Sequence, residues 1–416
     1  MALTRRTFLQ SALAGLTFSV FPSWMPRLAF TPKNAAARGD VLVCLFLRGA
    51  ADALNIVVPF GEDEYYRQRP TIAIARPDDG RMNSPLRAMD LDGFFGLHPA
   101  LEKLLPAWQA KQLAFVHACG APDESRSHFQ AMELMERGCE AASGPGTGWL
   151  GRHLASLDTN NHSPLRAVGI GERVPRMLQG TIPASALRSI ADFHLRGDAA
   201  SVQAMQNALG NLYASDAAMG EIGGETMNML AILEKLSATG YIPRAGATYP
   251  ESELGLGLKQ IAALLKAQVG LEIACVDVGG WDTHIAQGGG EGGMAQLLRD
   301  VGDSLAAFYH DVADYSQQLS IVVMSEFGRR VQENGGLGTD HGHGSVMWLL
   351  GGNVRGGRVH GEWRGLQHEN LFQGMDVAVT TDYRDVLSEV LVKRLNNPNV
   401  VDVFPNYQAT MRGVVN

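Results

Sequence analysis

Short apolar runs are the feature that most restricts how this chain folds. The first of them, Val41–Leu47, reads VLVCLFL without a polar residue. A strand with one face in water alternates apolar and polar residues, so an unbroken run indicates a strand that is covered on both faces, as in a parallel sheet. Further strands are predicted at 113–118, 165–170, 271–278, 319–324 and 346–350, with a shorter candidate at 71–75.

Segments with helical spacing lie between these runs. They are found at 99–110, 127–138, 254–269, 294–315 and 382–395. Strands that alternate with helices favour an α/β fold, here a doubly wound, mostly parallel sheet with helices on both faces. Residues from about 175 to 245 carry Met, Leu and Ala at spacings of three and four, which predicts a helical insertion in that fold.

The N-terminal residues 1–37 are predicted to be a signal peptide. The string TRRTFL at 4–9 matches the pattern of a twin-arginine export motif, and a moderately apolar stretch follows at 11–20. That stretch is shorter than the ~20 apolar residues that span a bilayer, so a membrane anchor is the less favoured interpretation. We therefore expect export by the twin-arginine translocase, a periplasmic location, and one mature domain at 38–416 without a membrane span.

Charge and cysteine content narrow the classes of function. The net charge is -8 and no segment forms a basic face, which argues against nucleic acid as a partner. The four cysteines include no Cys-x-x-Cys pair, which disfavours a thiolate metal site or a redox site. Cys44 and Cys275 lie in apolar runs and are expected to be buried. A disulfide between Cys119 and Cys139 is left open, because the periplasm permits one.

Polar residues with metal-binding or nucleophilic side chains follow most of the predicted strands. In an open α/β sheet, the loops at the carboxyl ends of the strands form the ligand site. Carboxylates and imidazoles at several strand ends are what a divalent metal requires. A Ser at a helix N-terminus can act as a nucleophile where the helix dipole favours an anion. The residues are Asp52, Ser125, Arg126, Ser127, His128, Asp282, His284, Glu326, Arg329, Asp340, His341, His343 and His360.

Each of these residues also has a purely structural interpretation. An Asp after a strand is often a turn residue, and Ser127 is placed to cap the helix that follows it. His128 is equally suited to be a hydrogen-bonded partner in the core, and Glu326 with Arg329 to form an ion pair. The strings around Asp282 and Asp340 are less common and favour a functional role.

Several strings resemble the bacterial proteins that are grouped as domain of unknown function 1501, which are typically exported by the twin-arginine route. That family is similar in turn to the alkaline phosphatase and sulfatase superfamily. The resemblance implies a doubly wound α/β core, metals at strand ends, and cleavage of phosphate or sulfate esters. The matching strings are FLRGAADALN (46–55), RPTIAIA (69–75), GLHPAL (96–101), RSHFQA (126–131), GGWDTH (279–284), SEFGR (325–329) and TDHGHG (339–344).

The resemblance also implies roles for individual residues. Asp52 is similar to the Asp that ends the first strand and binds one metal, and Ser127, or else Ser125, lies where the nucleophile would be. Apart from the resemblance, the hypothesis of a hydrolase gives Arg126 or Arg329 the role of holding an oxyanion of the substrate. The other implied ligands of divalent ions such as zinc, manganese or calcium are Asp282, His284, Asp340, His341 and, more weakly, His360.

Two departures from the superfamily pattern keep a second function open. Asp282 and His284 are two residues apart rather than four, and no Cys stands where sulfatases modify one, which argues against a formylglycine sulfatase. The first hypothesis is an exported metal-dependent hydrolase acting on a small anionic ester, with Ser127 or a metal-activated water attacking. The alternative is a non-catalytic periplasmic binding or assembly protein that retains the fold. A redox protein is disfavoured, because no haem, iron–sulfur or dinucleotide motif occurs.

Overall fold

The computed structural model describes residues 40–80, 86–139, 144–157, 159–161, 163–190 and 240–416, together with a few separate positions between 191 and 239. The predicted signal peptide at 1–37 lies outside the described residues, as does most of the predicted helical insertion. Within the described part of the chain, no helix is long and apolar enough to cross a lipid bilayer.

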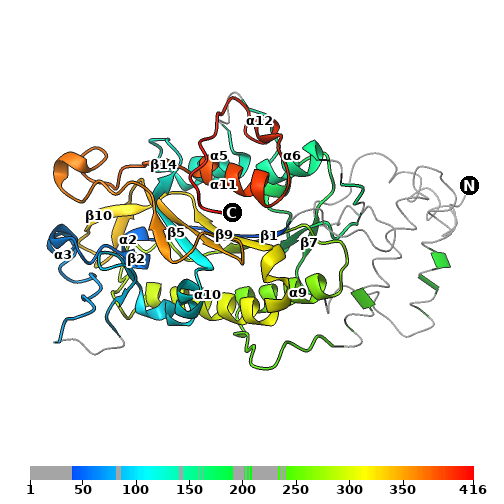
Figure 1. Cartoon of the computed structure of the whole chain (residues 1–416), viewed down its shortest axis with the longest axis horizontal. Coiled ribbons are helices and arrows are strands. Elements are labelled where there is room, and N and C mark those ends of the chain that lie inside the picture. Colours follow the sequence, from blue (N-terminus) through cyan, green and yellow to red (C-terminus); the bar gives the residue numbers. More distant parts are fainter. Residues whose placement is uncertain are drawn as a thin grey trace, which may run out of the picture.

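A large central sheet organises the chain (Figure 1). Among the described residues it contains nine strands, in the order β13-β5-β12-β9-β1-β8-β6-β7, with β14 also beside β5. Their bounds are β1 Val41–Leu47, β5 Leu113–Gly120, β6 Ala167–Ile170, β7 Ser185–Leu187, β8 Ile273–Val278, β9 Leu319–Ser325, β12 Ser345–Leu350, β13 Arg358–His360 and β14 Thr381–Asp382.

One strand of this sheet runs against the others. β12 pairs antiparallel with both β5 and β9, whereas every other pairing in the sheet is parallel. The predicted mostly parallel sheet is therefore confirmed. The reversal brings the segment that precedes β12 to the same edge as the carboxyl ends of β1, β8 and β9.

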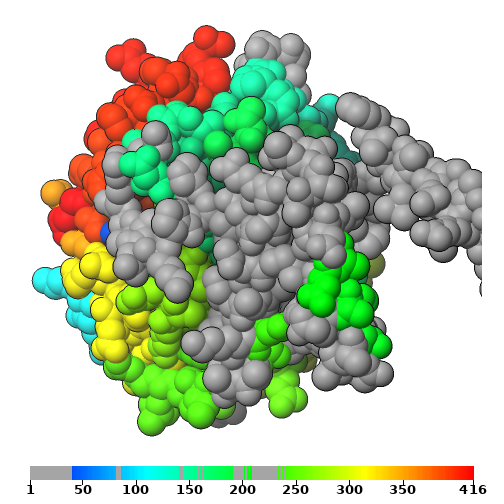
Figure 2. All heavy atoms as spheres, turned by 90° about the vertical axis from the view of Figure 1, so that its right-hand side faces the viewer, coloured from blue at the N-terminus to red at the C-terminus, as the bar shows by residue number. Residues whose placement is uncertain are grey.

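Helices cover both faces of the sheet, which confirms the predicted α/β class. One face packs on α9 (Glu253–Lys266), α10 (Gly293–Asp311), η2 (Pro99–Leu104) and α4 (Leu105–Gln109). The other face packs on α5 (His128–Arg137), α6 (Trp149–Ser156), α11 (Tyr383–Lys393) and α12 (Val400–Val403). Figure 2 shows the two layers from one end, with the teal and red segments above and yellow-green α9 below.

The alternation along β1 explains its apolar run. Val43 and Leu45 contribute to the core on the α9 and α10 face, while Cys44 and Phe46 contribute to the core beneath α6 and α11. Each of these four side chains is completely buried. A strand in this position has no face in water, so every residue along it is apolar.

Helix α5 begins and ends where its sequence predicts, and it places a residue of the site. Ser127 occupies the N-cap position, and Gly138 ends the helix with a φ of +68°. A side chain at Gly138 would come within 2.6 Å of the Phe404 ring, so both the backbone angle and the packing require glycine.

Two parts of the chain differ from the sequence expectations. Residues 71–75 form no strand: Thr71 and Ile72 lie in a turn, where Glu333 accepts hydrogen bonds from their backbone N–H groups, and Ala75 makes only an isolated bridge with Arg87. The described start of the expected helical insertion, 175–190, contains the turn η3 (Arg176–Leu178) and the edge strand β7.

Short elements complete the described structure. Two small antiparallel sheets lie beside the main one. All four cysteines are buried and free, so no disulfide joins Cys119 and Cys139. The remaining elements are α2 Ala53–Ile56, β2 Val57–Val58, α3 Asp63–Gln68, β3 Met89–Asp90, β4 Gly96–Leu97, η4 Ala313–Gln318, β10 Arg329–Glu333, β11 Thr339–His341 and η5 His368–Asn370.

Candidate metal centre

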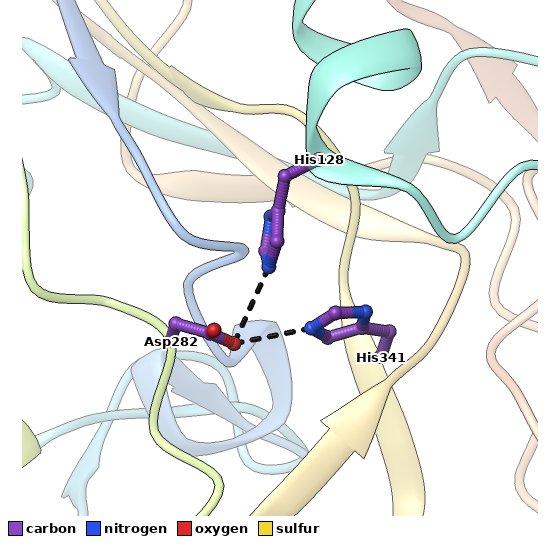
Figure 3. A group of neighbouring side chains, drawn as sticks. All are labelled: His128, Asp282 and His341. Carbon is purple, nitrogen blue, oxygen red and sulfur yellow. Dashed lines mark hydrogen bonds and ion pairs between the residues drawn. The ribbon is translucent and has the colours of Figure 1, made fainter.

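Two imidazoles and a carboxylate meet at the edge of the sheet where the parallel strands end (Figure 3). His128 is the first residue of α5, Asp282 follows β8, and His341 ends β11. One ligand atom from each residue lies within 4.8 Å of the other two. The hairpin of β10 and β11 reaches this edge because it precedes the reversed strand β12.

A third imidazole, that of His284, completes the group, which we call the cluster: His128, Asp282, His284 and His341. All three Nε2 atoms lie near one oxygen, Oδ1 of Asp282, at 3.3 Å for His128, 3.0 Å for His284 and 3.1 Å for His341. The Nε2 atoms of His284 and His341 are 2.9 Å apart. Four donor atoms from three segments of the chain therefore converge on one point.

The other ring nitrogen of each histidine contacts an acceptor outside the cluster. A carboxylate or a carbonyl can only accept, so each Nδ1 carries the proton and donates it outward. In the neutral imidazole the lone pair is then on Nε2 and points into the cluster. The outward bonds run from His128 to Glu326 Oε1 at 2.8 Å, from His284 to Asp340 Oδ1 at 3.1 Å, and from His341 to the Arg126 carbonyl at 2.8 Å.

Arg329 favours the ionised form of Asp282. Burial opposes its ionisation, but the hydrogen bond and the positive charge of Arg329 act against burial, and the pKa of Asp282 is lowered to about 2. Burial also lowers the pKa of His341, which favours its neutral, ligating form. Asp282 and His341 are 48% and 23% exposed, so the cluster is open to solvent on one side.

His128 fits a bound cation particularly well. Its Nε2 atom is buried and makes no hydrogen bond, although Asp282 Oδ1 lies 3.3 Å away. A lone pair directed at a carboxylate oxygen is unfavourable unless a positive charge lies between them. Three nitrogens and one carboxylate oxygen, each histidine oriented by an outer acceptor, form a donor set typical of zinc and similar ions.

Glu326 orients His128, and the sequence assigned neither residue a role at a metal. The Glu326 side chain is completely buried and accepts from the backbone N–H of Gly49 and from Ser325 Oγ in addition to His128. The sequence left Glu326 open as a partner of Arg329, and the structure gives it His128 instead. The signal was present in RSHFQA, where His128 shares a strand-end loop with Ser127.

Arg329 is a positioning residue rather than a clamp for substrate. Its side chain is completely buried, and every bond it makes is to the protein. It joins the loops that follow β1 and β8 to the hairpin, and so fixes Asp282 relative to His341. Its acceptors are the carbonyls of Gly49, Ala50, Trp281 and Thr339 and the carboxylate of Asp282, at 2.5 to 3.0 Å.

Asp52, expected to be a ligand, lies in a buried ion pair. Its oxygens accept from Arg69 at 2.5 and 3.0 Å and from Gln287 at 2.7 Å, and both side chains of the ion pair are completely buried. We call Asp52, Asn55, Tyr65, Arg69 and Gln287 the buried network. The structure places Asp52 there and not at the cluster, because the guanidinium of Arg69 already satisfies its charge.

Gln287 connects the buried network to the cluster. Its side-chain oxygen accepts from the hydroxyls of Thr283 and Thr339, both at 2.8 Å, while its nitrogen donates to Asp52. Thr283 lies between Asp282 and His284, and Thr339 starts the strand that ends at His341. Asp52 is thus linked to residues beside the cluster through the completely buried side-chain amide of Gln287.

Asp340 belongs to the outer layer of the cluster. Its Oδ1 accepts from His284 and from Asn334. The Asn334 hydrogen bond is the main reason why the pKa of Asp340 is lowered. In this arrangement Asp340 orients a ligand, whereas His341 beside it supplies one.

The expected substrate-binding residues before α5 are only partly available. Arg126 donates to the buried carboxylate of Asp376 at 2.6 Å and to Gln373, so it is committed within the protein. The Ser125 hydroxyl donates to Gln130. Ser127 precedes His128 directly, and its side chain makes no capping hydrogen bond to the helix, which leaves its hydroxyl available.

Two further histidines lie outside the cluster. His360 ends β13 beside Val116 of β5, and its Nε2 atom bonds the Arg355 carbonyl, so the structure does not bring it to the cluster. His343 lies two residues after His341 but is buried and stacked on Phe372. Burial lowers the pKa of His343 to about 4.

Comparisons with known proteins identify a family but not an activity. A search of curated proteins finds no match. A search of solved structures finds the crystal structure of a protein in the alkaline phosphatase superfamily from Vibrio parahaemolyticus, which is 10% identical, with 87% of this chain and 72% of that chain covered and a TM-score of 0.31. A family model with the description "Protein of unknown function (DUF1501)" matches residues 40–396. The chain belongs to this family of proteins of unknown function.

Proposed function

We propose that the cluster binds a divalent transition metal and forms the centre of a hydrolase. The convergence of three imidazole lone pairs on Asp282 is the observation that carries this proposal. The set is rich in nitrogen, which favours zinc, or manganese and similar ions, over calcium, because calcium takes oxygen ligands. A metal held by these residues would supply a Lewis acid for an ester oxygen.

The N-terminus of α5 supports an anionic ester as the substrate. Backbone N–H groups at a helix N-terminus attract anions, and α5 begins at a residue of the cluster. The available hydroxyl of Ser127 adjoins the same residue. We propose a phosphate or related ester as substrate, with Ser127 or a water molecule as the nucleophile.

Elemental analysis of the purified protein tests the metal centre. We expect near-stoichiometric metal in the parent and its loss in the double variant Asp282→Ala, His341→Ala. His343→Ala is the matched control, because His343 belongs to the same TDHGHG string but not to the cluster. A parent that stays free of metal after reloading, or a folded double variant that keeps its metal, would contradict the proposal.

Turnover of phosphate mono- and diesters by the metal-loaded protein tests the hydrolase. Loss of turnover in folded, metal-loaded Ser127→Ala identifies that serine as the nucleophile, and retention identifies water. Inactivity of the metal-loaded parent against the whole panel would reject hydrolysis of these esters while leaving the metal site standing.

The alternative proposal is a non-catalytic binding or assembly protein. The ion pair of Arg329 with Asp282 favours it, because Arg329 already neutralises the carboxylate without a metal. This alternative predicts that Ser127→Ala, with folding intact, leaves the protein's cellular function unchanged. Under the hydrolase proposal with Ser127 as nucleophile, the same substitution removes that function.

We also propose that the chain is exported by the twin-arginine translocase into the periplasm. The string TRRTFL at 4–9 supports this proposal. Replacing Arg5 and Arg6 with Lys is expected to retain the protein in the cytoplasm, as measured by cell fractionation. Periplasmic recovery of that variant at the parental level would contradict it.

A further inference from the structure

Three residues that adjoin the backbone of the cluster residues carry large, exposed hydrophobic side chains. Phe129 follows His128 and is 84% exposed, and Ile285 follows His284 and is 78% exposed. Leu337 precedes β11, which carries His341, and is 54% exposed. We call these three residues the apolar rim. Single exposed hydrophobic residues are ordinary on a protein surface, but several that border one site indicate a binding role.

Two members of the apolar rim are held side by side by the backbone. The N–H of Ala286 donates to the Gly336 carbonyl at 2.9 Å, and the N–H of Gln287 donates to the Leu337 carbonyl at 3.0 Å. A Cβ atom placed on Gly336 would lie 3.4 Å from Cγ1 of Ile285. The segment after His284 and the turn that carries Leu337 therefore form one continuous border.

Leu337 stands at a backbone position that does not suit it. Its φ is +60°, a left-handed value that glycine or asparagine adopts at lower cost. More than half of its side chain is exposed, so burial compensates little for this strain. Strained backbone tends to persist at functional sites.

We propose that the apolar rim binds the organic group of an ester whose anionic group lies at the cluster. The substrate class is then an alkyl or aryl ester of phosphate, in which a hydrophobic group adjoins the charge. This inference rests on the proposed function, because the cluster supplies the site for the anionic group. The three side chains come from two sides of the cluster, α5 on one side and the adjoining loops on the other.

Binding of n-alkylphosphonates to the metal-loaded protein tests this inference without turnover, since the carbon–phosphorus bond is not an ester bond. Calorimetry with methyl-, butyl- and octylphosphonate measures the effect of chain length. Because a fully buried methylene contributes up to about fourfold in affinity, we expect octylphosphonate to bind at least ~10-fold more tightly than methylphosphonate.

The triple variant Phe129→Ser, Ile285→Ser, Leu337→Asn is expected to remove the effect of chain length while still binding methylphosphonate. The substitutions are at exposed positions, and Asn relieves the strain at 337, so folding is preserved. The matched control is Val401→Ser, Met411→Ser, since these side chains are 67% and 48% exposed and not adjacent to cluster residues. It should keep the parental dependence on chain length.

The outcomes separate this inference from the proposed function. Equal affinity of the parent for methyl- and octylphosphonate, with metal bound, would overturn the inference that the apolar rim binds the organic group, and would leave the proposed function standing. An unchanged dependence in the triple variant would do the same, as would self-association of the parent that the triple variant abolishes. A parent that binds neither metal nor any phosphonate would overturn both.

Discussion

The buried network is built around Asp52, which follows β1, and the cluster around Asp282, which follows the neighbouring strand β8. In the buried network, the donors of Arg69 meet Asp52, Asn55 and the backbone carbonyls of residues 330 and 331. In the cluster, three nitrogen lone pairs face one carboxylate that is half exposed. A set of donors satisfied within the protein holds the fold together, whereas a set of acceptors that converge is suited to bind a cation.

The histidines show the same difference. His117 and His98 lie near Asp52, and in each the Nδ1 atom accepts a backbone N–H and the Nε2 atom contacts a backbone carbonyl. The cluster histidines have Nδ1 as the donor and Nε2 directed inward. The tautomer that the neighbours impose therefore distinguishes a structural histidine from a candidate ligand.

Removing Arg69 is the strongest test of the buried network. Arg69→Ala leaves the Asp52 carboxylate buried without its partner, and we expect a loss of about 3 to 5 kcal/mol in the free energy of unfolding, measured in urea. The control Arg76→Ala breaks the exposed pair with Asp63 and should cost less than about 1 kcal/mol. Equal effects of the two substitutions would remove the distinction drawn here.

The pH dependence of stability tests the structural histidines. Burial lowers the pKa of His117 to about 4 from its ordinary value of 6.5. Between these values the unfolded chain binds more protons, so the stability that His117 contributes is complete above pH 6.5 and falls as the pH drops towards 4. We expect the parent to lose on the order of 3 kcal/mol more than His117→Gln between pH 7 and pH 4. Parallel curves from urea unfolding at each pH would argue against it.

Neutralising Glu326 tests the orientation of the cluster. Glu326→Gln removes the charge that holds His128 and is expected to weaken metal binding about 10- to 100-fold, measured by competition with a chelator. Glu333→Gln is the matched control, because Glu333 lies in β10 of the neighbouring hairpin but bonds Thr71 and Ile72 instead. Metal affinity that is unaffected by Glu326→Gln would show that this carboxylate is only structural.

The substitution with the smallest expected effect, Thr339→Val, tests the connection between the buried network and the cluster. Thr339→Val removes the hydroxyl that bonds Gln287 while keeping the shape of the side chain, and should cost about 1 kcal/mol in unfolding free energy. It should also weaken metal binding by less than about 10-fold, which is the lower limit for removing an outer partner. Thr380→Val, which removes a bond to the Glu362 carbonyl, is the control and should leave metal affinity unchanged.

The sequence predicted the strands and helices that are set by local patterns. The run at Val41–Leu47 matches β1, and the helix expected from Ser127 to about Gly138 is α5, because an unbroken apolar run and helix caps are patterns of residues that are neighbours in the chain. The candidate strand at 71–75 was not confirmed, since a carboxylate from residue 333 binds its backbone. Asp282, His284 and His341 were each predicted to bind a metal, but their convergence on one oxygen, Oδ1 of Asp282, was not predicted.

What the sequence by itself determined is the family, the α/β class and the set of polar residues at the strand ends. Which of them converge was decided by the tertiary structure. Arg69, seventeen residues after Asp52, takes the carboxylate that was expected to bind metal, and Glu326 orients a histidine that lies 198 positions away in the chain. The reversed strand β12 brings His341 to the same edge as His128. A hydrogen bond depends on the distance and direction between two groups in space, and only the folded chain fixes these for residues far apart in the sequence.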